Sequence, residues 1–419
     1  MTFPADMHRG VALRSYLAAT HLIPLVAKPI LKRRLKRGKE HPTRWREKLG
    51  QGLAARPNGP LIWLHAVGLG EVLSLRGLID RLGAARPDLS FLVTSNTAAS
   101  AQVFAKHAPA RTIHRFFPLD APTYRRRFLD HFAPDLCIWA EQDLWPGMAS
   151  DLAARGIPQC LIAARMNARS YRSHQKAASL YRDLYSAMAL VTAQDQATAD
   201  HLNALGAQAT VSGSLKPAAP QLRCDTDDLD RISAHLSGRF TWVVASAHPD
   251  DIAVACAAHD QLRQTDPSAL LIIAPRFPDR PLDVQGPQRS KAQMPGQNDP
   301  IWLFDTFGEL GLVYRLAGAA LIGGTFGEIE GHNPWEAAAL GCAVLHGPRT
   351  ANFRDDYARL ADVSGAITVQ KAYEVTTALT SAKLEATSDN ATRAISVASA
   401  QVDTLAERLL WVLEASDDS

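Results

Sequence analysis

Short apolar runs alternate along the chain with segments in which apolar residues recur every three or four positions. The apolar runs lie at 61–67, 91–97, 136–142 and 159–165, and again at 241–247, 270–276 and 319–325. Uninterrupted apolar runs of this length are typical of strands buried on both faces of a parallel sheet. After the first run, one helical face collects Val72, Leu75, Leu78, Ile79 and Leu82. The pattern predicts an α/β fold.

The runs form two similar series. The first runs of the two series start 180 residues apart, at 61 and 241, and the next start 179 apart, at 91 and 270. We therefore expect two doubly wound, Rossmann-like domains that face each other across a cleft, with ligands at the carboxyl ends of the strands. No GxGxxG follows the first run and no Walker A sequence occurs, which disfavours a dinucleotide fold and ATP hydrolysis.

The expected boundaries follow from where this pattern starts and stops. A connector at 212–230 is rich in Pro, Ser and Asp, and a final helical pattern carries Leu405, Leu409, Leu410 and Leu413 on one face. The predicted organisation is a membrane-associating segment (1–49), a first Rossmann-like domain (50–215), a linker (216–230), a second Rossmann-like domain (231–391) and a C-terminal helix (392–419).

The N-terminal segment combines a long apolar run with a basic stretch. Residues 10–31 are apolar except for Arg14, His21 and Lys28 at seven-residue intervals, and Pro24 and Pro29 should kink or end the helix. Such a run suits a helix lying in a membrane interface better than one crossing it. The basic stretch that follows favours an anionic cytoplasmic leaflet. The alternative is a basic helix packed on the protein.

Composition and charge narrow the function classes. Hydrophobic residues make up 47% and charged residues 21%, as in an ordinary globular protein. Residues 1–50 hold 12 Lys and Arg against 3 Asp and Glu, and the remainder 33 against 39, so the basic charge belongs to the N-terminal segment rather than to a nucleic-acid-binding face. Five scattered cysteines without a CxxC disfavour disulfides and zinc knuckles and suit the cytoplasm.

Several polar residues lie where apolar runs end. They are Glu71, Glu141, Lys216, Arg276 and Glu309, and each has an ordinary structural explanation on its own. Near position 333, Asn333 suits a helix N-cap, Pro334 the first turn and Glu336 the third position, so this is either a capping box or a ligand site. No metal site is predicted, because Asp225 and Asp227 lie in the connector and His248, Asp250 and Asp251 lack ligand spacing.

The order and spacing of eight motifs resemble those of the 3-deoxy-D-manno-octulosonic acid (Kdo) transferase family over residues 30–415. The motifs are HAVGLGEV (65–72), AEQDLWP (140–146), AARMNARS (163–170), GSLK (213–216), APRFPDR (274–280), FDTFGELGLVY (304–314), GGTFGEIEGHNPWEAAALG (323–341) and GPRTANFRD (347–355). The resemblance implies a GT-B fold and an inverting, metal-independent transfer of Kdo from CMP-Kdo to a lipid A precursor. It places the enzyme at the cytoplasmic face of the bacterial inner membrane.

The resemblance also implies residue roles. Glu71 matches the general base, and Glu141 and Lys216 match transition-state stabilisers. The positions that match CMP contacts are Pro275, Arg276, Phe307, Gly308, Glu309, Asn333, Pro334, Trp335 and Glu336. Arg165 is a further cation suited to the carboxylate of Kdo. No cofactor is expected beyond the donor substrate.

Some positions depart from the family pattern. They are Gly68 for Ser, Gly147 for Asn, Ala163 for Asn, Phe277 for His and Phe307 for Met, together with FGEIE at 326–330 in place of a neutral or basic segment. Two added carboxylates beside an anionic donor should repel it unless they point elsewhere. Two alternatives therefore stay open: a related transferase with another acceptor or nucleotide sugar, and a non-catalytic sugar- or nucleotide-binding protein on the membrane.

Overall fold

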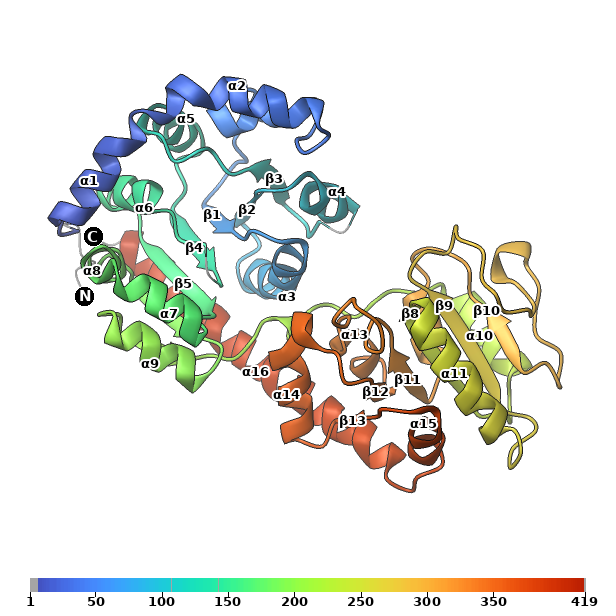
Figure 1. The fold of residues 1–419 in the computed structure, drawn as a ribbon. Coiled ribbons are helices and arrows are strands. Elements are labelled where there is room, and N and C mark those ends of the chain that lie inside the picture. The colour runs from blue at the N-terminus through green and yellow to red at the C-terminus, as the bar shows by residue number, and fades with distance from the viewer. Residues whose placement is uncertain (1–6, 107, 142, 418–419) are drawn as a thin grey trace. The chain divides into compact units, whose positions relative to one another are not determined.

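The computed structural model describes residues 7–106, 108–141 and 143–417, which divide into two units (Figure 1). Unit 1 contains the chain up to Ala219 and again from Ala398, and unit 2 contains Pro220–Val397. Each unit has one parallel sheet with helices on both faces, which confirms the predicted α/β class. The sheets are described separately because each has its own core.

Unit 1 is built on a seven-stranded parallel sheet in the order β3-β2-β1-β4-β5-β6-β7. Its strands are β1 (Leu61–His65), β2 (Ser90–Ser95), β3 (Thr112–Phe116), β4 (Leu136–Ala140), β5 (Gln159–Ala164), β6 (Leu190–Ala193) and β7 (Ala209–Val211). Its helices after β1 are α3 (Leu69–Ala85), α4 (Ala98–Lys106), α5 (Pro122–Phe132), α6 (Pro146–Ala153), α7 (Ala168–Gln175), α8 (Ala178–Ser186) and α9 (Gln196–Ala204). The strand order reverses between β1 and β4, where ligands of open α/β sheets bind.

Alternate residues along the strands point to opposite faces of this sheet, and each face has its own hydrophobic core. On one face, Trp63 and Trp139 pack with residues of α5, α6 and α8. On the other, the predicted helical face from Val72 to Leu82 is fully buried against the strands. The C-terminal helix α16 (Leu384–Asp417) adds Leu405, Leu409 and Leu413 to this second core, and it begins eight residues earlier than expected.

Unit 2 has a six-stranded parallel sheet in the order β10-β9-β8-β11-β12-β13. Its strands are β8 (Thr241–Ala247), β9 (Leu270–Pro275), β10 (Ile301–Leu303), β11 (Ala319–Ile322), β12 (Ala343–His346) and β13 (Ala366–Thr368). Its helices are α10 (Thr226–His235), α11 (Pro249–Leu262), α12 (Leu310–Leu316), α13 (Trp335–Ala338), α14 (Arg354–Asp362) and α15 (Ala372–Leu379). The buried strands β8 and β9 divide their side chains between two cores, as in unit 1.

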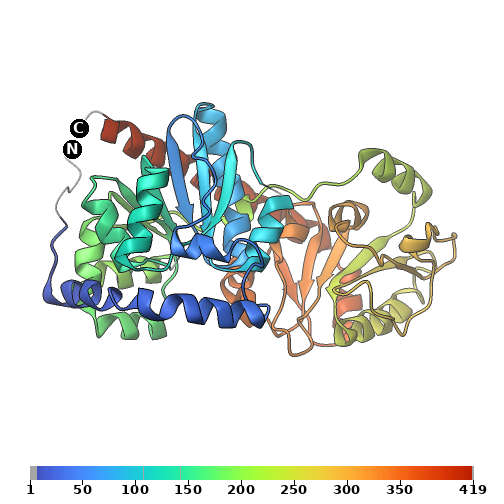
Figure 2. The ribbon, with the colours of Figure 1, turned by 90° about the horizontal axis from the view of Figure 1, so that it is seen from above.

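The N-terminal helices α1 (Val11–Thr20) and α2 (Ile23–Lys36) run along one side of unit 1 (Figures 1 and 2). The break between them comes just before Pro24, which occupies the first turn of α2, whereas Pro29 lies within the helix. Leu13, Ala27 and Leu31 are buried against the unit. Within the ranges given above, no helix has both the length and the apolar character needed to cross a bilayer.

Candidate functional site

In unit 1, the loops that follow three adjacent strands, β1, β4 and β5, carry Glu71, Glu141 and Arg165. Parallel strands all end at the same edge of their sheet, so these three residues share that edge. The sequence predicted this common position, and the geometry around each side chain shows how it is held.

Glu71 occupies the third position of α3. Its Oε2 accepts hydrogen bonds from the backbone N–H groups of Val67 at 2.9 Å and Gly68 at 3.3 Å, as a capping residue does. Its Oε1 accepts no hydrogen bond from any residue that the structure describes. A carboxylate fixed through one oxygen, with the other available, is a well-oriented proton acceptor. The capping and catalytic interpretations of Glu71 are therefore compatible.

Glu141 is held in a left-handed backbone conformation with φ of 62°. Its N–H donates to the carbonyl of Ile162 at 3.0 Å, and its carbonyl accepts from the N–H of Arg165 at 3.3 Å. Opposite it, Ala163 is also left-handed, with φ of 47°, beside a register shift between β5 and β6. Such backbones cost about 1–3 kcal/mol each and persist mainly where surrounding structure fixes them, often at functional sites.

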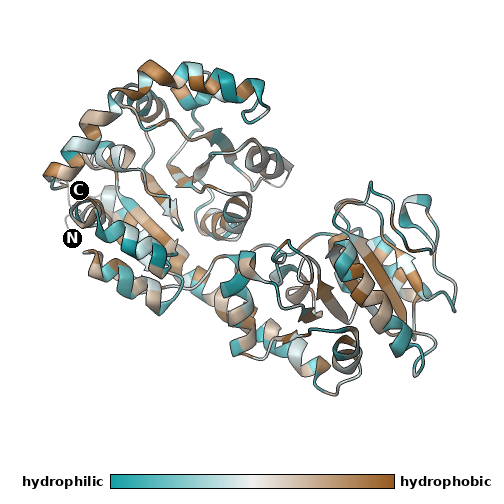
Figure 3. Cartoon of the chain, in the orientation of Figure 1, coloured by the Kyte–Doolittle hydropathy of each residue, from teal (hydrophilic) through white to brown (hydrophobic). Residues whose placement is uncertain are grey.

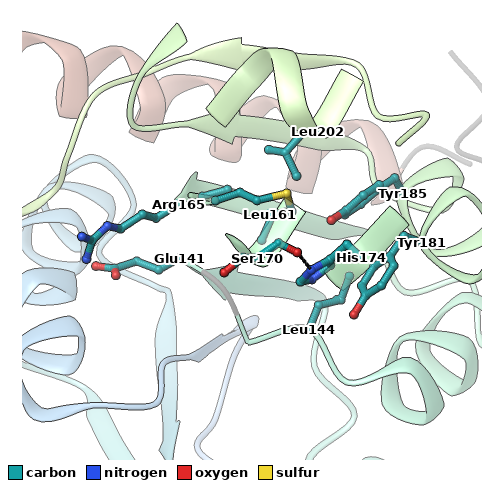
Figure 4. Close-up of a pocket in the computed structure, with 11 residues that line it drawn as sticks. Glu141, Leu144, Leu161, Arg165, Ser170, His174, Tyr181, Tyr185 and Leu202 are labelled. Atoms are coloured by element: carbon teal, nitrogen blue, oxygen red, sulfur yellow. Dashed lines mark hydrogen bonds between the residues drawn. The ribbon is translucent and has the colours of Figure 1, made fainter. Parts of the chain in front are cut away.

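The side chains of Glu141 and Arg165 lie together at the mouth of a cavity of about 70 Å³ (Figure 4). Figure 4 shows the carboxylate of Glu141 beside the guanidinium of Arg165. The inner wall is formed by Leu144, Leu161, Met166, Tyr181, Tyr185 and Leu202. A space of this size holds a few water molecules and no sugar ring. The chemical interest of this pocket therefore lies at its charged mouth.

Asp143 is a residue that the sequence analysis did not single out. Its Oδ2 accepts hydrogen bonds from His65 at 3.0 Å, Trp145 at 2.9 Å and Asn96 at 3.2 Å. Burial opposes the ionisation of Asp143, but these bonds outweigh it and hold the pKa below its usual value. Asp143 thus joins the ends of β1 and β2 to the loop that contains Glu141.

Lys216 begins a short 3₁₀ helix (Lys216–Ala218) and is half-buried. This turn packs directly on α3, because a Cβ added at Gly77 would lie 2.3 Å from the carbonyl oxygen of Ala218. The structure therefore brings the turn of Lys216 against the helix that begins beside Glu71. The two residues lie 145 positions apart in the chain.

In unit 2, the loops after four adjacent strands carry the other candidate residues. Arg276 follows β9, Phe307–Glu309 follows β10, His248 follows β8, and Asn333–Glu336 follows β11. All of them lie at the carboxyl edge of this second sheet. The sequence predicted the positions after β9, β10 and β11, and assigned no function to His248.

The helix near position 333 begins later than the capping pattern predicted. α13 starts at Trp335, so Pro334 takes the N-cap position, and Asn333 Oδ1 accepts from the Trp335 N–H at 3.1 Å. Asn333 Nδ2 donates to Glu336 at 3.3 Å. The Trp335 side chain is buried, and its indole donates to Asp356 at 2.9 Å. Asn333 and Glu336 are therefore the polar side chains that this segment can offer to a ligand.

Glu336 and Arg276 carry opposite charges and differ in burial. Burial raises the pKa of Glu336, although the bond from Asn333 and the charge of Arg276 both act against the rise. Arg276 itself is exposed at the end of β9, and its N–H donates to the carbonyl of Ala247 at 2.9 Å. Pro275, the last residue of β9, is buried.

The segment after β10 presents an exposed aromatic ring and an internal ion pair. Phe307 is 72% exposed, and Gly308 has φ of +84°. Glu309 accepts from Arg289 at 2.7 Å and also from the hydroxyl of Thr306. Arg289, which the sequence analysis did not identify, also pairs with Asp228. The carboxylate of Glu309 is therefore already neutralised by a cation of its own unit.

The two carboxylates of the 326–330 segment have different surroundings. Glu330 binds Arg349 through Nη2 at 2.6 Å and Nε at 3.0 Å, whereas Glu328 is exposed. The Arg349 side chain, with the N–H of Ala351, lowers the pKa of Glu330. One of the two added charges is thus matched by an arginine that lies 19 residues away in the chain.

Asp225 in the connector and Asp251 in α11 have structural partners. Asp225 caps α10 by accepting from the Asp228 N–H at 3.0 Å. Asp251 is fully buried and accepts hydrogen bonds from four backbone N–H groups. Across residues 7–106, 108–141 and 143–417, no three His, Cys, Asp or Glu side chains are grouped as metal ligands would be.

Comparisons with known proteins agree on one family. A family model described as 3-deoxy-D-manno-octulosonic-acid transferase (kdotransferase) matches residues 43–219. A probable mitochondrial 3-deoxy-D-manno-octulosonic acid transferase of Arabidopsis thaliana is 32% identical over 360 residues, 81% of this chain and 80% of the relative. The corresponding transferase of Rickettsia bellii is 29% identical over 373 residues, 87% of this chain and 89% of the relative.

Among solved structures, the UDP-GlcNAc 2-epimerase of Neisseria meningitidis bound to UDP-GlcNAc has a TM-score of 0.53 and 11% identity, covering 84% of this chain and 99% of that chain. At that identity the likeness concerns the fold alone.

Proposed function

Because the chain belongs to the 3-deoxy-D-manno-octulosonic acid transferase family, whose members are glycosyltransferases of GT-B fold, we propose that it moves Kdo from CMP-Kdo to a lipid A precursor. The observation that carries this proposal is the 32% identity over 81% of the chain, which extends through both units. The transfer inverts the anomeric carbon and uses no catalytic metal. The chemistry is divided between the carboxyl edges of the two sheets.

In unit 1, Glu71 takes the proton of the acceptor hydroxyl as that oxygen attacks the anomeric carbon. Its Oε2 is anchored to the loop by the Val67 and Gly68 N–H groups, which leaves Oε1 for the substrate. General-base catalysis of this kind contributes about 10²–10⁴-fold to a rate. Glu141 and Lys216 stabilise the charges that develop during transfer, and Arg165 offers a cation for the carboxylate of Kdo.

In unit 2, Arg276 stabilises the phosphate that leaves with CMP, and Glu336 accepts hydrogen bonds from the ribose hydroxyls. A fixed cation beside a departing phosphate lowers the barrier without a metal. Asn333 orients Glu336 through the 3.3 Å bond. The pairing of Glu330 with Arg349 removes one of the two charges that favoured a different donor. The exposed Glu328 is the added charge that remains in this segment.

The N-terminal helices hold the enzyme on the cytoplasmic face of the inner membrane, where the lipid acceptor lies. Large apolar side chains on them are exposed: Val11 (73%), Leu22 (64%), Leu25 (74%), Val26 (53%) and Ile30 (51%). Figure 3 shows apolar and polar positions mixed along both helices. Basic residues are interspersed at Arg14, Lys28, Lys32 and Arg33. This combination is typical of helices that insert partway into an anionic leaflet.

A transfer assay tests the proposed reaction. Purified protein, a tetraacylated lipid A precursor and CMP-Kdo generated in situ are incubated together, and the lipid products are weighed by mass spectrometry. We expect products heavier by one or more Kdo units, also when EDTA is added together with the transferase after CMP-Kdo has formed. An unchanged lipid mass with CMP still bound would contradict the proposed acceptor, and products that disappear with EDTA would contradict metal independence.

A flotation assay tests the membrane surface separately. Leu13, Ala27 and Leu31 are buried, so deleting the helices would expose the core, and a point change is preferable. Leu25→Glu should weaken binding to vesicles that contain phosphatidylglycerol, while Val397→Glu, at a 60% exposed position of α16, should not. Binding should also weaken at high salt, because salt screens surface charge. Equal flotation of both variants would contradict this role for α2.

A further inference from the structure

His248 and His332 form a hydrogen-bonded pair at the carboxyl edge of the unit 2 sheet. Their Nε2 atoms are 3.1 Å apart, and their rings lie 12° from parallel with centroids 5.3 Å apart. One Nε2 must carry a hydrogen and the other must not, because a neutral imidazole has one donor and one acceptor nitrogen. Such a pair can gain one proton and keep this bond, whereas a second proton would break it.

Asp251 holds together the two chain segments that carry the histidine pair. The Oδ2 of Asp251 accepts from the N–H groups of His248 at 2.9 Å and Gly324 at 2.6 Å, so it joins the end of β8 to the loop after β11. Gly324 is left-handed with φ of +72°, and a Cβ there would lie 3.1 Å from the His332 ring. The Tyr357 hydroxyl donates to the His332 carbonyl at 2.9 Å. These contacts fix the backbone segments from which the two rings project.

Burial lowers the pKa of both histidines and keeps the pair neutral in the free protein, although the charges of Asp251 and Asp250 act against this at His248. His248 is influenced by Asp250, Asp251, Arg276 and Arg280, and His332 by Arg276 and His248. Burial and the charge of Arg276 lower the pKa of both, that of His332 to about 4. A doubly negative group near Arg276 would offset that positive charge and favour a proton on the pair.

Three N–H groups of the loop after β11 are not open to such an anion. Asp251 already accepts from the N–H groups of Gly324, Thr325 and Phe326 at 2.6–3.2 Å. Side chains at this edge can supply the positive charge for a phosphate instead. Arg276 supplies one charge, and the neighbouring histidine pair is a second source.

We propose that the His248–His332 pair takes up one proton from solvent when the phosphate of CMP becomes a dianion in the donor site. The inference rests on the proposed function. When the bond between the anomeric carbon and the phosphate oxygen breaks, its electron pair stays on the phosphate, whose charge changes from −1 to −2. The acceptor proton goes to Glu71, and the pair balances the new charge with a proton from water. The pair is thereby a phosphate-binding group specific for the dianionic product.

Isothermal titration of CMP into the full-length protein tests this directly. Titrations at pH 6.5 in buffers of different ionisation enthalpy give the number of protons taken up per CMP bound. The phosphate of CMP also titrates, with a pKa of about 6, so the informative quantity is the difference between proteins. The variants are His248→Asn and His332→Asn, and the matched control is His235→Gln, whose ring contacts the Pro295 carbonyl.

We expect wild type and the His235 variant to take up about half a proton or more beyond either pair variant, because an adjacent dianion shifts a pKa by about 1–3 units or more. Cytidine, which lacks the phosphate, should give no such difference. Equal proton uptake in all four proteins, with CMP bound, would overturn the pair's role and leave the proposed function standing. Failure of CMP to bind wild type would overturn both.

A measurement on wild type alone guards against a variant that does not fold. The affinity for CMP relative to cytidine is followed from pH 6.5 to 9, where most of the CMP phosphate is a dianion. We expect the ratio to fall as pH rises, by up to about tenfold per unit while the complex holds a proton that the free pair lacks, and to level off once the complex has lost that proton. A ratio that stays constant from pH 6.5 to 9 would contradict the proposal.

Discussion

Replacing Asp251 by asparagine changes one oxygen into an NH₂ group at a fully buried position. The carboxylate accepts four backbone N–H groups, two on each oxygen, from His248, Gly324, Thr325 and Phe326. An amide can keep the two bonds on its remaining oxygen, but its NH₂ group then faces two N–H donors. The variant should therefore loosen the junction between the end of β8 and the loop after β11.

The size of the effect follows from the number of bonds lost. A hydrogen bond to a charged group contributes about 1.5–3 kcal/mol, so the loss of two corresponds to about 3–6 kcal/mol. Each 1.4 kcal/mol is a tenfold change in an equilibrium constant, which makes local opening roughly 10²-fold or more frequent. The neighbouring Asp250 is exposed, and its carboxylate accepts no hydrogen bond within the described ranges, so Asp250→Asn is a control with the same loss of charge.

Hydrogen–deuterium exchange of the amides at 323–327 measures this opening directly. We expect these amides to exchange roughly 10²-fold faster in Asp251→Asn and at the wild-type rate in Asp250→Asn. The strands of unit 1 serve as an internal reference, because they belong to another unit. Equal exchange rates at 323–327 in all three proteins would refute the reasoning, since the carboxylate would then not be what holds the loop.

Three further changes have defined outcomes. Gly147→Ala should lower the free energy of unfolding in urea by about 2–4 kcal/mol, because its Cβ would lie 2.3 Å from Nη1 of the buried Arg125. The control Gly83→Ala, in α3, should not lower it. Glu336→Gln should weaken CMP binding about 10-fold or more in calorimetry and abolish any preference over 2′-deoxyCMP, without lowering Tm, since a neutral amide is easier to bury. Burial lowers the folded-state pKa of His114 to about 3, so the unfolded chain binds the proton more readily. The free energy of unfolding should therefore fall by up to about 1.4 kcal/mol for each pH unit below 6.5, and His114→Gln should reduce this slope.

The sequence patterns located seven of the thirteen strands that the described residues form. All seven predicted apolar runs contain a strand, because an uninterrupted apolar run of about seven residues leaves a clear signal. The missed strands are β3, whose apolar residues are separated by polar ones, and β6, β7, β10, β12 and β13, which have only three or four residues each and are defined by their pairing partners. The same limit applies to the helix at Trp335, whose start depends on how Asn333 folds back on the chain.

For the site, the sequence indicated which residues lie at the same sheet edge, but it did not indicate which side chains contact one another. Residues that follow neighbouring strands share one edge of their sheet, which is how Glu71 and Glu141 in unit 1, and separately Arg276 and Glu309 in unit 2, could be grouped from the sequence. The pairing of Glu330 with Arg349 depends on a turn that no local pattern reveals. The meeting of His248 with His332, 84 positions apart, likewise depends on Asp251 joining two loops. The one signal in the sequence was an acidic residue, Asp251, four residues after the end of β8.

The most direct test of the account is the transfer rate of Glu71→Gln, measured together with its affinity for CMP. Glutamine has nearly the same shape and can keep an acceptor oxygen for the Val67 and Gly68 N–H groups, but it cannot take a proton. We predict a loss of about 10²–10⁴-fold in Kdo transfer with CMP affinity unchanged. Transfer at the wild-type rate would contradict the assignment of Glu71 as the base and, with it, the central claim about how unit 1 acts.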